Sequence, residues 1–173
     1  LALVLPALGC IGWSWLYALN SERAQAATVG RIVRVQTEQI LTHALDILPR
    51  VTALAAQPCP AVHASLLRWG TLNPYFRSLL LVRRDRIYCS SVLGDVDYDT
   101  GTFPRWPVGT PPTQWFVSVT GTPLAPERPA LLLGMAGEDG RGGVVVIDGR
   151  YVQDLLNAVS SLGAYQLEVT LGR

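Results

Sequence analysis

Apolar and polar residues follow a helical pattern in the first part of the chain. From Asn20 to Gln57, apolar residues recur at the spacing of one helix face. Pro49 lies inside this stretch, and we expect a kink or short break there because proline lacks an amide hydrogen. A shorter helix is predicted from Pro60 to Gly70, because proline suits a first helical turn and glycine suits a helix end.

The rest of the chain consists mainly of short apolar runs separated by turn residues. Two runs, Tyr75–Val82 and Arg86–Val92, flank a charged turn and predict a β-hairpin. Asp95–Pro112 contains so many glycines and prolines that we expect a long surface loop. Three more strands, a helix and a closing strand are predicted at Gln114–Thr120, Ala130–Met135, Gly143–Ile147, Tyr151–Leu162 and Tyr165–Leu171.

This order of elements, helix first and hairpins afterwards, predicts an α+β fold. Antiparallel strands joined by short turns form one sheet, and the helices then pack on it. We expect about five or six strands with helices on one side, an arrangement of the PAS/Cache-like kind.

The N-terminal segment Leu1–Leu19 carries no charge and ends in tryptophan and tyrosine residues. About 20 apolar residues span a bilayer, and aromatic rings favour its surface, so we expect a transmembrane helix here. A secretory signal peptide is the alternative, because Ala24–Ala27 resembles a cleavage site. Both interpretations export residues 20–173 as a separate domain.

The charges and the arrangement of polar residues exclude two classes of function. The chain has 14 basic residues, all arginine, against 13 acidic ones, and its formal net charge is +1. We therefore expect no nucleic-acid partner, since nucleic acid requires a clustered basic face. No nucleophile stands at a recognisable spacing from a base, so we expect neither enzymatic activity nor a cofactor.

Two of the three cysteines, Cys59 and Cys89, lie in the predicted exported part, whereas Cys10 lies in the apolar segment. The pair is open to three interpretations: two buried thiols, part of a metal site, or a disulfide. Export favours the disulfide, which would contribute about 3–4 kcal/mol by closing a loop of about 31 residues. From the residues alone, such a bond is structural more often than regulatory, because regulation needs a sulfur that a reductant can reach.

Metal sites are less well supported. His63 follows Cys59 by one helical turn, but with Cys89 this makes only three ligands, and we expect a polar surface histidine. Asp95–Gly101 has acidic residues at alternate positions, as calcium loops do. Trp106 stands where such a loop needs its closing glutamate, so we expect a solvated acidic loop and no metal.

The sequence Cys89–Ser90–Ser91, together with the Pro58–Cys59 pair and Ser65–Arg68, resembles the CSS-motif sensor domain. That domain is the periplasmic input module of bacterial membrane-bound EAL-type cyclic-di-GMP phosphodiesterases. The resemblance implies a disulfide between Cys59 and Cys89 that holds the phosphodiesterase down, and whose reduction releases its activity. Pro60 departs from the pattern, because the family usually has serine after the first cysteine.

The resemblance also implies a location and partners. It places the chain at the bacterial inner membrane, with residues 20–173 in the periplasm and the EAL phosphodiesterase domain outside this chain. The implied partners are the membrane, a second copy of the chain in a homodimer, and periplasmic disulfide-exchange proteins.

An alternative function is an extracellular PAS/Cache-like domain that binds a small molecule and has a purely structural disulfide. Its pocket is expected near the loop Asp95–Pro112. The candidate lining residues are Tyr98, Trp106, Arg105 and Arg77.

Overall fold

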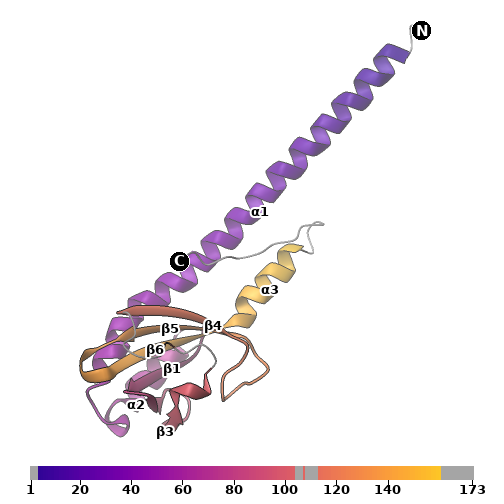
Figure 1. Ribbon diagram of the computed structural model, residues 1–173. Coiled ribbons are helices and arrows are strands. Elements are labelled where there is room, and N and C mark those ends of the chain that lie inside the picture. The colour runs from indigo at the N-terminus through magenta and orange to yellow at the C-terminus, as the bar shows by residue number, and fades with distance from the viewer. Residues whose placement is uncertain (1–3, 104–106, 108–112, 161–173) are drawn as a thin grey trace. The chain divides into compact units, whose positions relative to one another are not determined.

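The computed structural model describes residues 4–103, 107 and 113–160 (Figure 1). The chain divides into two compact units, one of residues 1–38 with 155–173 and one of residues 39–154. All six strands belong to the second unit, and so do both predicted disulfide cysteines. The sheet and both cysteines therefore lie in the same compact unit.

Helix α1 runs without interruption from Val4 to Leu54, so the helix expected from Asn20 is confirmed and begins earlier. The break expected at Pro49 is wrong, because the helix continues through this residue. Proline costs a helix the bond to the carbonyl four residues earlier. Leu45 and Pro49 are both exposed, so water can reach the carbonyl that this proline leaves without a donor.

A membrane span at Leu1–Leu19 is not supported. No helix in the part of the chain that the structure describes combines the length and the hydropathy that crossing a bilayer requires.

The sheet has six strands in the order β3-β2-β1-β6-β5-β4, and every neighbouring pair is antiparallel. This confirms the predicted α+β class and antiparallel sheet. The strands are β1 (Phe76–Arg83), β2 (Arg86–Ser90), β3 (Gly94–Asp99), β4 (Gln114–Val119), β5 (Ala130–Ala136) and β6 (Arg141–Asp148). Helix α2 spans Cys59–Thr71 and helix α3 spans Gly149–Ser160, so both predicted short helices are present. The predicted closing strand, Tyr165–Leu171, lies outside the described residues.

The loop expected at Asp95–Pro112 is wrong in its first part. Gly94–Asp99 forms β3 at the edge of the sheet, followed by a short 3-10 turn at Thr100–Thr102. The glycines and prolines that predicted the loop begin only at Gly101, after β3, and the acidic residues of β3 are exposed. An edge strand pairs on one side only, so it tolerates polar side chains that a central strand would not.

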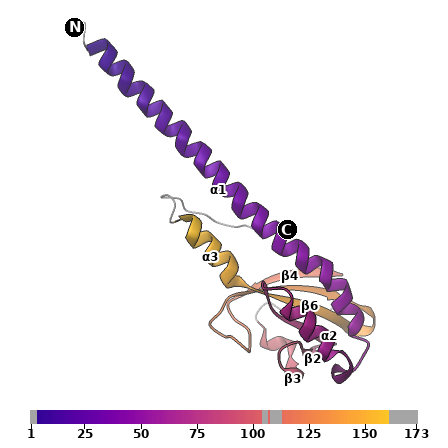
Figure 2. The same cartoon turned by 180° about the vertical axis from the view of Figure 1, so that it is seen from behind.

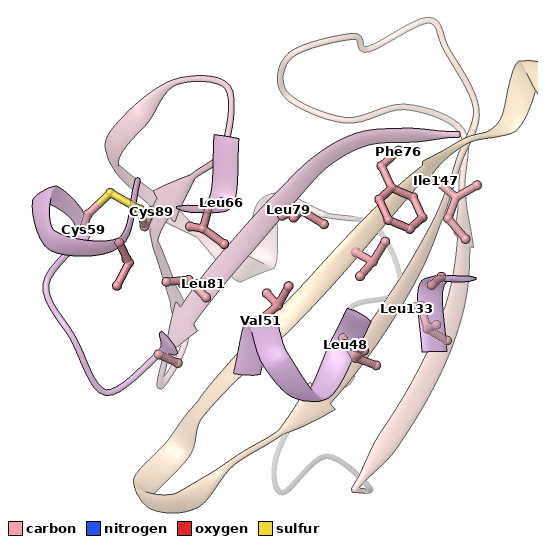
Figure 3. Close-up of a cluster of buried hydrophobic side chains, with 14 of the residues drawn as sticks. Leu48, Val51, Cys59, Leu66, Phe76, Leu79, Leu81, Cys89, Leu133 and Ile147 are labelled. Atoms are coloured by element: carbon pink, nitrogen blue, oxygen red, sulfur yellow. A yellow bond between two sulfur atoms is a disulfide. The ribbon is translucent and has the colours of Figure 1, made fainter. Parts of the chain in front are cut away.

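One face of the sheet is covered by α2 and by the part of α1 from Gln39 onward (Figures 1 and 2). Figure 3 shows the core between them, in which Leu48 and Val51 of α1 and Leu66 of α2 face Leu79 and Leu81 of β1. Cys59 and Cys89 belong to the same buried cluster. The disulfide site is thus part of the main hydrophobic core.

The opposite face of the sheet carries a second buried cluster. It alternates with the first along the strands, as expected for side chains that point to opposite faces. Its members are Leu80, Val82, Ile87, Phe103, Val119, Ala130, Leu132, Val144 and Val146. Both faces of the central strands are therefore buried.

Candidate functional site: a disulfide between a helix start and a sheet strand

The sulfur atoms of Cys59 and Cys89 are bonded to each other, which is the pairing that the resemblance implied. Their Cα atoms are 5.3 Å apart, within the usual range for a disulfide. Cys59 is the first residue of α2, and Cys89 lies in β2, between β1 and β3. The bond therefore ties the start of a helix to an inner strand of the sheet.

Local sequence explains why Cys59 begins a helix. Pro58 adopts an extended conformation before the helix, and Pro60 lies in the first turn, where a missing amide hydrogen costs nothing. The departure from the family pattern at Pro60 is thus compatible with the helix. Pro58 offers no side-chain cap, and Ala56, Gln57 and Pro58 are all exposed. Residues 55–58 form a short linker between α1 and α2, in which Ala55 is buried in the core and the other three residues face solvent.

Both cysteines are nevertheless buried. Cys59 is 3% exposed and Cys89 is 0% exposed. Thiol–disulfide exchange requires a thiolate to reach one of the sulfur atoms directly. A reductant can therefore attack this bond only after an opening of the protein, local or global, uncovers it.

The two serines of the motif shape the chain directly after β2. Ser91 Oγ accepts a hydrogen bond from the backbone N–H of Leu79 at 2.9 Å, and the Ser91 N–H donates to the Leu79 carbonyl at 2.8 Å. Ser90 Oγ accepts weaker bonds from the N–H groups of Val92 and Leu93, at 3.3 and 3.4 Å. Ser91 therefore fastens the motif to β1, and Ser90 shapes the turn that follows.

The far end of α2 also packs on the motif. A Cβ atom added to Gly70 would lie 3.3 Å from Ser91 Oγ, so the last turn of the helix comes close to this serine. Cys89 thus holds the first residue of α2, and Ser91 packs against its last turn. The CSS sequence contacts both ends of one helix.

His63 differs from its prediction as a polar surface residue. It is half-buried, and its Nε2 atom is buried without a hydrogen-bond partner among the described residues. The ring faces Gly94, where an added Cβ would lie 3.6 Å from Nε2 and where φ is +76°. The described residues contain no cluster of histidine, cysteine and acidic side chains that could hold a metal ion.

Tyr88 is a site residue that the sequence analysis did not identify. Its hydroxyl lies 3.1 Å from the carbonyl oxygen of Ala55 and 3.0 Å from that of Gln57. Tyr88 and Cys89 are adjacent in the chain, yet both side chains pack against the helix-covered core. The cause is a shift in the register of β2 with β3 between Ile87 and Cys89. Strict alternation would have placed them on opposite faces, so the sequence pattern carries no signal for this contact.

The residues proposed for a ligand pocket are not gathered in one place by the described structure. Arg105 and Trp106 lie outside the described residues. Tyr98 lines a small pocket of about 20 Å³, which is enough for about one water molecule. Arg77 instead donates hydrogen bonds to Asp148 and to the carbonyls of Arg128 and Pro129, at 2.9–3.0 Å.

The Arg77–Asp148 pair is a structural ion pair. Their side chains are 10% and 11% exposed. Burial acts to raise the pKa of Asp148, but hydrogen bonds from the Arg150 N–H and from the Arg77 guanidinium outweigh it and lower the pKa. Asp148 directly precedes α3, and by accepting from the Arg150 N–H it caps that helix.

A larger pocket of about 360 Å³ lies at the ends of the central strands. Val82, Val144 and Trp115 supply apolar lining, and Arg84 and Asp85 supply charge. Trp115 lies over Gly134, where an added Cβ would meet the indole ring at 2.1 Å. This volume is within the range of pockets that bind small molecules.

Comparison with known proteins gives one family. The family model described as a CSS motif domain associated with EAL matches residues 22–173. A search among curated proteins finds no match. The matched range includes both bonded cysteines, both serines of the motif and every strand.

Proposed function

We propose a redox-sensing role for this chain, which belongs to the CSS-motif domain family associated with EAL. Domains of this family are sensors and are not themselves catalytic. The proposed signal is the state of the Cys59–Cys89 bond, and the proposed output is the activity of an EAL-type cyclic-di-GMP phosphodiesterase domain. We place residues 20–173 in the periplasm, where disulfides form and persist.

The position of the bond between two elements supports this role most directly. The disulfide joins α2 to the sheet only five residues after α1 ends at Leu54. A dithiol reductant would convert the bond into two thiols and become a disulfide itself. The start of α2 and the preceding linker would then lose their covalent tie to β2. Helix α1 could shift at its C-terminal end, and this shift is the proposed signal to the output domain.

Serine substitution of the cysteines tests the proposal. Cys59→Ser and Cys89→Ser should each raise cyclic-di-GMP hydrolysis, in protein that carries the EAL domain, to the level of the reduced wild type. Added dithiothreitol should then have no further effect on either variant. Cys10→Ser is the matched control and should behave as wild type, because this cysteine takes no part in the bond. Equal hydrolysis by oxidised wild type and by both variants would contradict redox control.

Small-molecule binding is the second candidate, and the pocket of about 360 Å³ is the observation that favours it. In this case the disulfide would only stabilise the fold. A thermal-shift screen should then find a compound that raises the melting temperature equally with and without reductant. Loss of the shift in Trp115→Ala would locate the compound in the larger pocket, and loss in Tyr98→Ala would locate it near the loop expected from the sequence.

A further inference from the structure

The hydroxyl group of Tyr88 connects the sheet to the linker that precedes Cys59. It donates to the carbonyl oxygens of Ala55 and Gln57, which share its single proton at 3.1 and 3.0 Å. The linker's own backbone bonds are local, from the Ala55 N–H to Thr52 and from the Gln57 N–H to Leu54. Tyr88 therefore adds long-range hydrogen bonds to a segment whose backbone N–H groups bond locally and whose Ala55 side chain packs in the core.

The surroundings of Tyr88 favour this attachment. The guanidinium of Arg83 lies over the tyrosine ring, 4.7 Å from its centre, and this cation–π contact helps to hold the ring in place. Burial raises the pKa of Tyr88, so its hydroxyl remains a donor at neutral pH. The ring itself packs against the core cluster that contains the disulfide.

The linker is the exposed segment of chain next to the disulfide. Ala56, Gln57 and Pro58 are exposed and lead directly into Cys59, whereas Cys89 lies in an inner strand and is 0% exposed. Displacement of this linker would uncover the Cys59 sulfur first. Uncovering Cys89 would require a larger opening, because its side chain belongs to the core cluster that α1 and α2 cover.

We propose that Tyr88 is a latch that sets how fast a thiol reductant gains access to the Cys59–Cys89 bond. The inference rests on the proposed redox function and adds a residue that regulates it. When the linker opens, a thiolate of a dithiol reductant attacks the Cys59 sulfur and forms a mixed disulfide. Cys89 leaves with the bonding electron pair and takes up a proton. The second thiol of the reductant, as a thiolate, then attacks the reductant sulfur that is bonded to Cys59. The reductant becomes an internal disulfide, and Cys59 is released as a thiolate.

Replacing Tyr88 by phenylalanine tests the latch, because it removes the hydroxyl and keeps the ring. The oxidised chain is treated with dithiothreitol under native conditions, and free thiols are counted over time by alkylation and mass shift. Loss of one hydrogen bond makes the opening of the linker more favourable by the net free energy of that bond. We therefore expect Tyr88→Phe to be reduced about three- to tenfold faster than wild type. Tyr98→Phe is the matched control, since Tyr98 is an exposed tyrosine on β3, and its rate should equal that of wild type.

A second control separates local opening from general loss of stability. Asp148→Asn breaks the buried pair with Arg77 and destabilises the fold away from the linker. Local opening predicts that this variant is reduced at the wild-type rate. If Asp148→Asn accelerates reduction as much as Tyr88→Phe does, the bond is reached through global unfolding and the latch is wrong.

Tyr88→Phe also distinguishes a failure of the latch from a failure of the proposed redox function. In protein that carries the EAL domain, Tyr88→Phe should reach full phosphodiesterase activation sooner after dithiothreitol is added, with the same final activity. An unchanged reduction rate in Tyr88→Phe would overturn the latch and leave redox control standing. Faster reduction without any change in hydrolysis would support the latch and overturn redox control.

Discussion

Asp148 shows how one buried carboxylate can hold several elements together. It belongs to β6, accepts from Arg77 of β1 at 3.0 Å, and caps α3 through the Arg150 N–H. The pKa of Asp148 is lowered in the folded protein from its ordinary value of 3.8. The ionised carboxylate therefore stabilises the fold fully at pH values above 3.8. That contribution is lost as the pH falls through the lowered pKa.

We expect Asp148→Asn to lower the free energy of unfolding at neutral pH by about 3 kcal/mol, because it leaves Arg77 buried without a counter-charge. The variant should also lose less stability than wild type between about pH 5 and pH 2. Urea unfolding at several pH values measures both effects. Asp97→Asn is the control, since its pair with Arg86 is exposed and its loss should leave the unfolding curve unchanged. Equal acid sensitivity in wild type and Asp148→Asn would refute this role.

The two serines of the motif are predicted to contribute unequally to the free energy of unfolding. Ser91→Ala leaves the buried N–H of Leu79 without an acceptor and should cost about 1–3 kcal/mol. Ser90→Ala should cost less, because its hydroxyl accepts two longer bonds in a turn whose residues Val92 and Leu93 are exposed. Chemical unfolding of the two oxidised variants compares them. The reverse order would show that the turn, and not the link to β1, is what Ser90 and Ser91 mainly support.

At the scale of elements, α1 packs closely on β6 at a glycine, Gly143, which has no side chain to keep the helix away. A Cβ atom at Gly143 would lie 2.7 Å from the backbone nitrogen of Thr52 and 2.9 Å from Val51 Cγ1. Helix and strand can approach this closely only because the position is glycine. The close packing of Val51 and Thr52 on β6 therefore depends on Gly143.

Gly143→Ala is expected to destabilise the fold by about 1–3 kcal/mol, because the helix must move away from β6. Gly30→Ala is the matched control: an added Cβ there meets nothing within 4 Å. Since alanine favours a helix over glycine by about 1 kcal/mol, Gly30→Ala should leave stability equal or slightly raised. Thermal unfolding of both variants measures the effect. A Gly143→Ala variant that melts at the wild-type temperature would show that α1 does not pack on β6 as described.

At the scale of the whole molecule, the disulfide links positions 30 residues apart and restricts the unfolded chain. Reduction should therefore lower the free energy of unfolding by about 3–4 kcal/mol. The expected measurement is a shift of the urea midpoint on adding reductant, absent in the Cys59→Ser, Cys89→Ser double variant. A reduced wild type as stable as the oxidised one would mean that the bond neither restricts the unfolded chain nor supports the core.

The local pattern of residues was sufficient for the order of most elements. The helix spacing after Asn20, the position of Pro60 at a helix start and the apolar runs around Arg84–Asp85 depend on neighbours in the chain, and the structure confirms the elements that they predict. Local pattern failed at β3, because the glycines and prolines from Gly101 onward predicted a loop that began at Asp95, whereas Gly94–Asp99 pairs as an edge strand. It also failed at Arg77, whose partner Asp148 lies 71 residues away.

The sequence by itself determined that two cysteines and a Cys–Ser–Ser stretch stand in one α+β domain, because residue identity and short-range spacing contain that information. Tertiary structure alone decided that the bond is buried, that Ser91 reaches Leu79, and that Tyr88 shares a face with Cys89. These features depend on how distant strands pair, and on a register shift that reverses the alternation of side chains. Access to the bond, and with it the proposed sensitivity to reductant, is therefore a property of the folded arrangement.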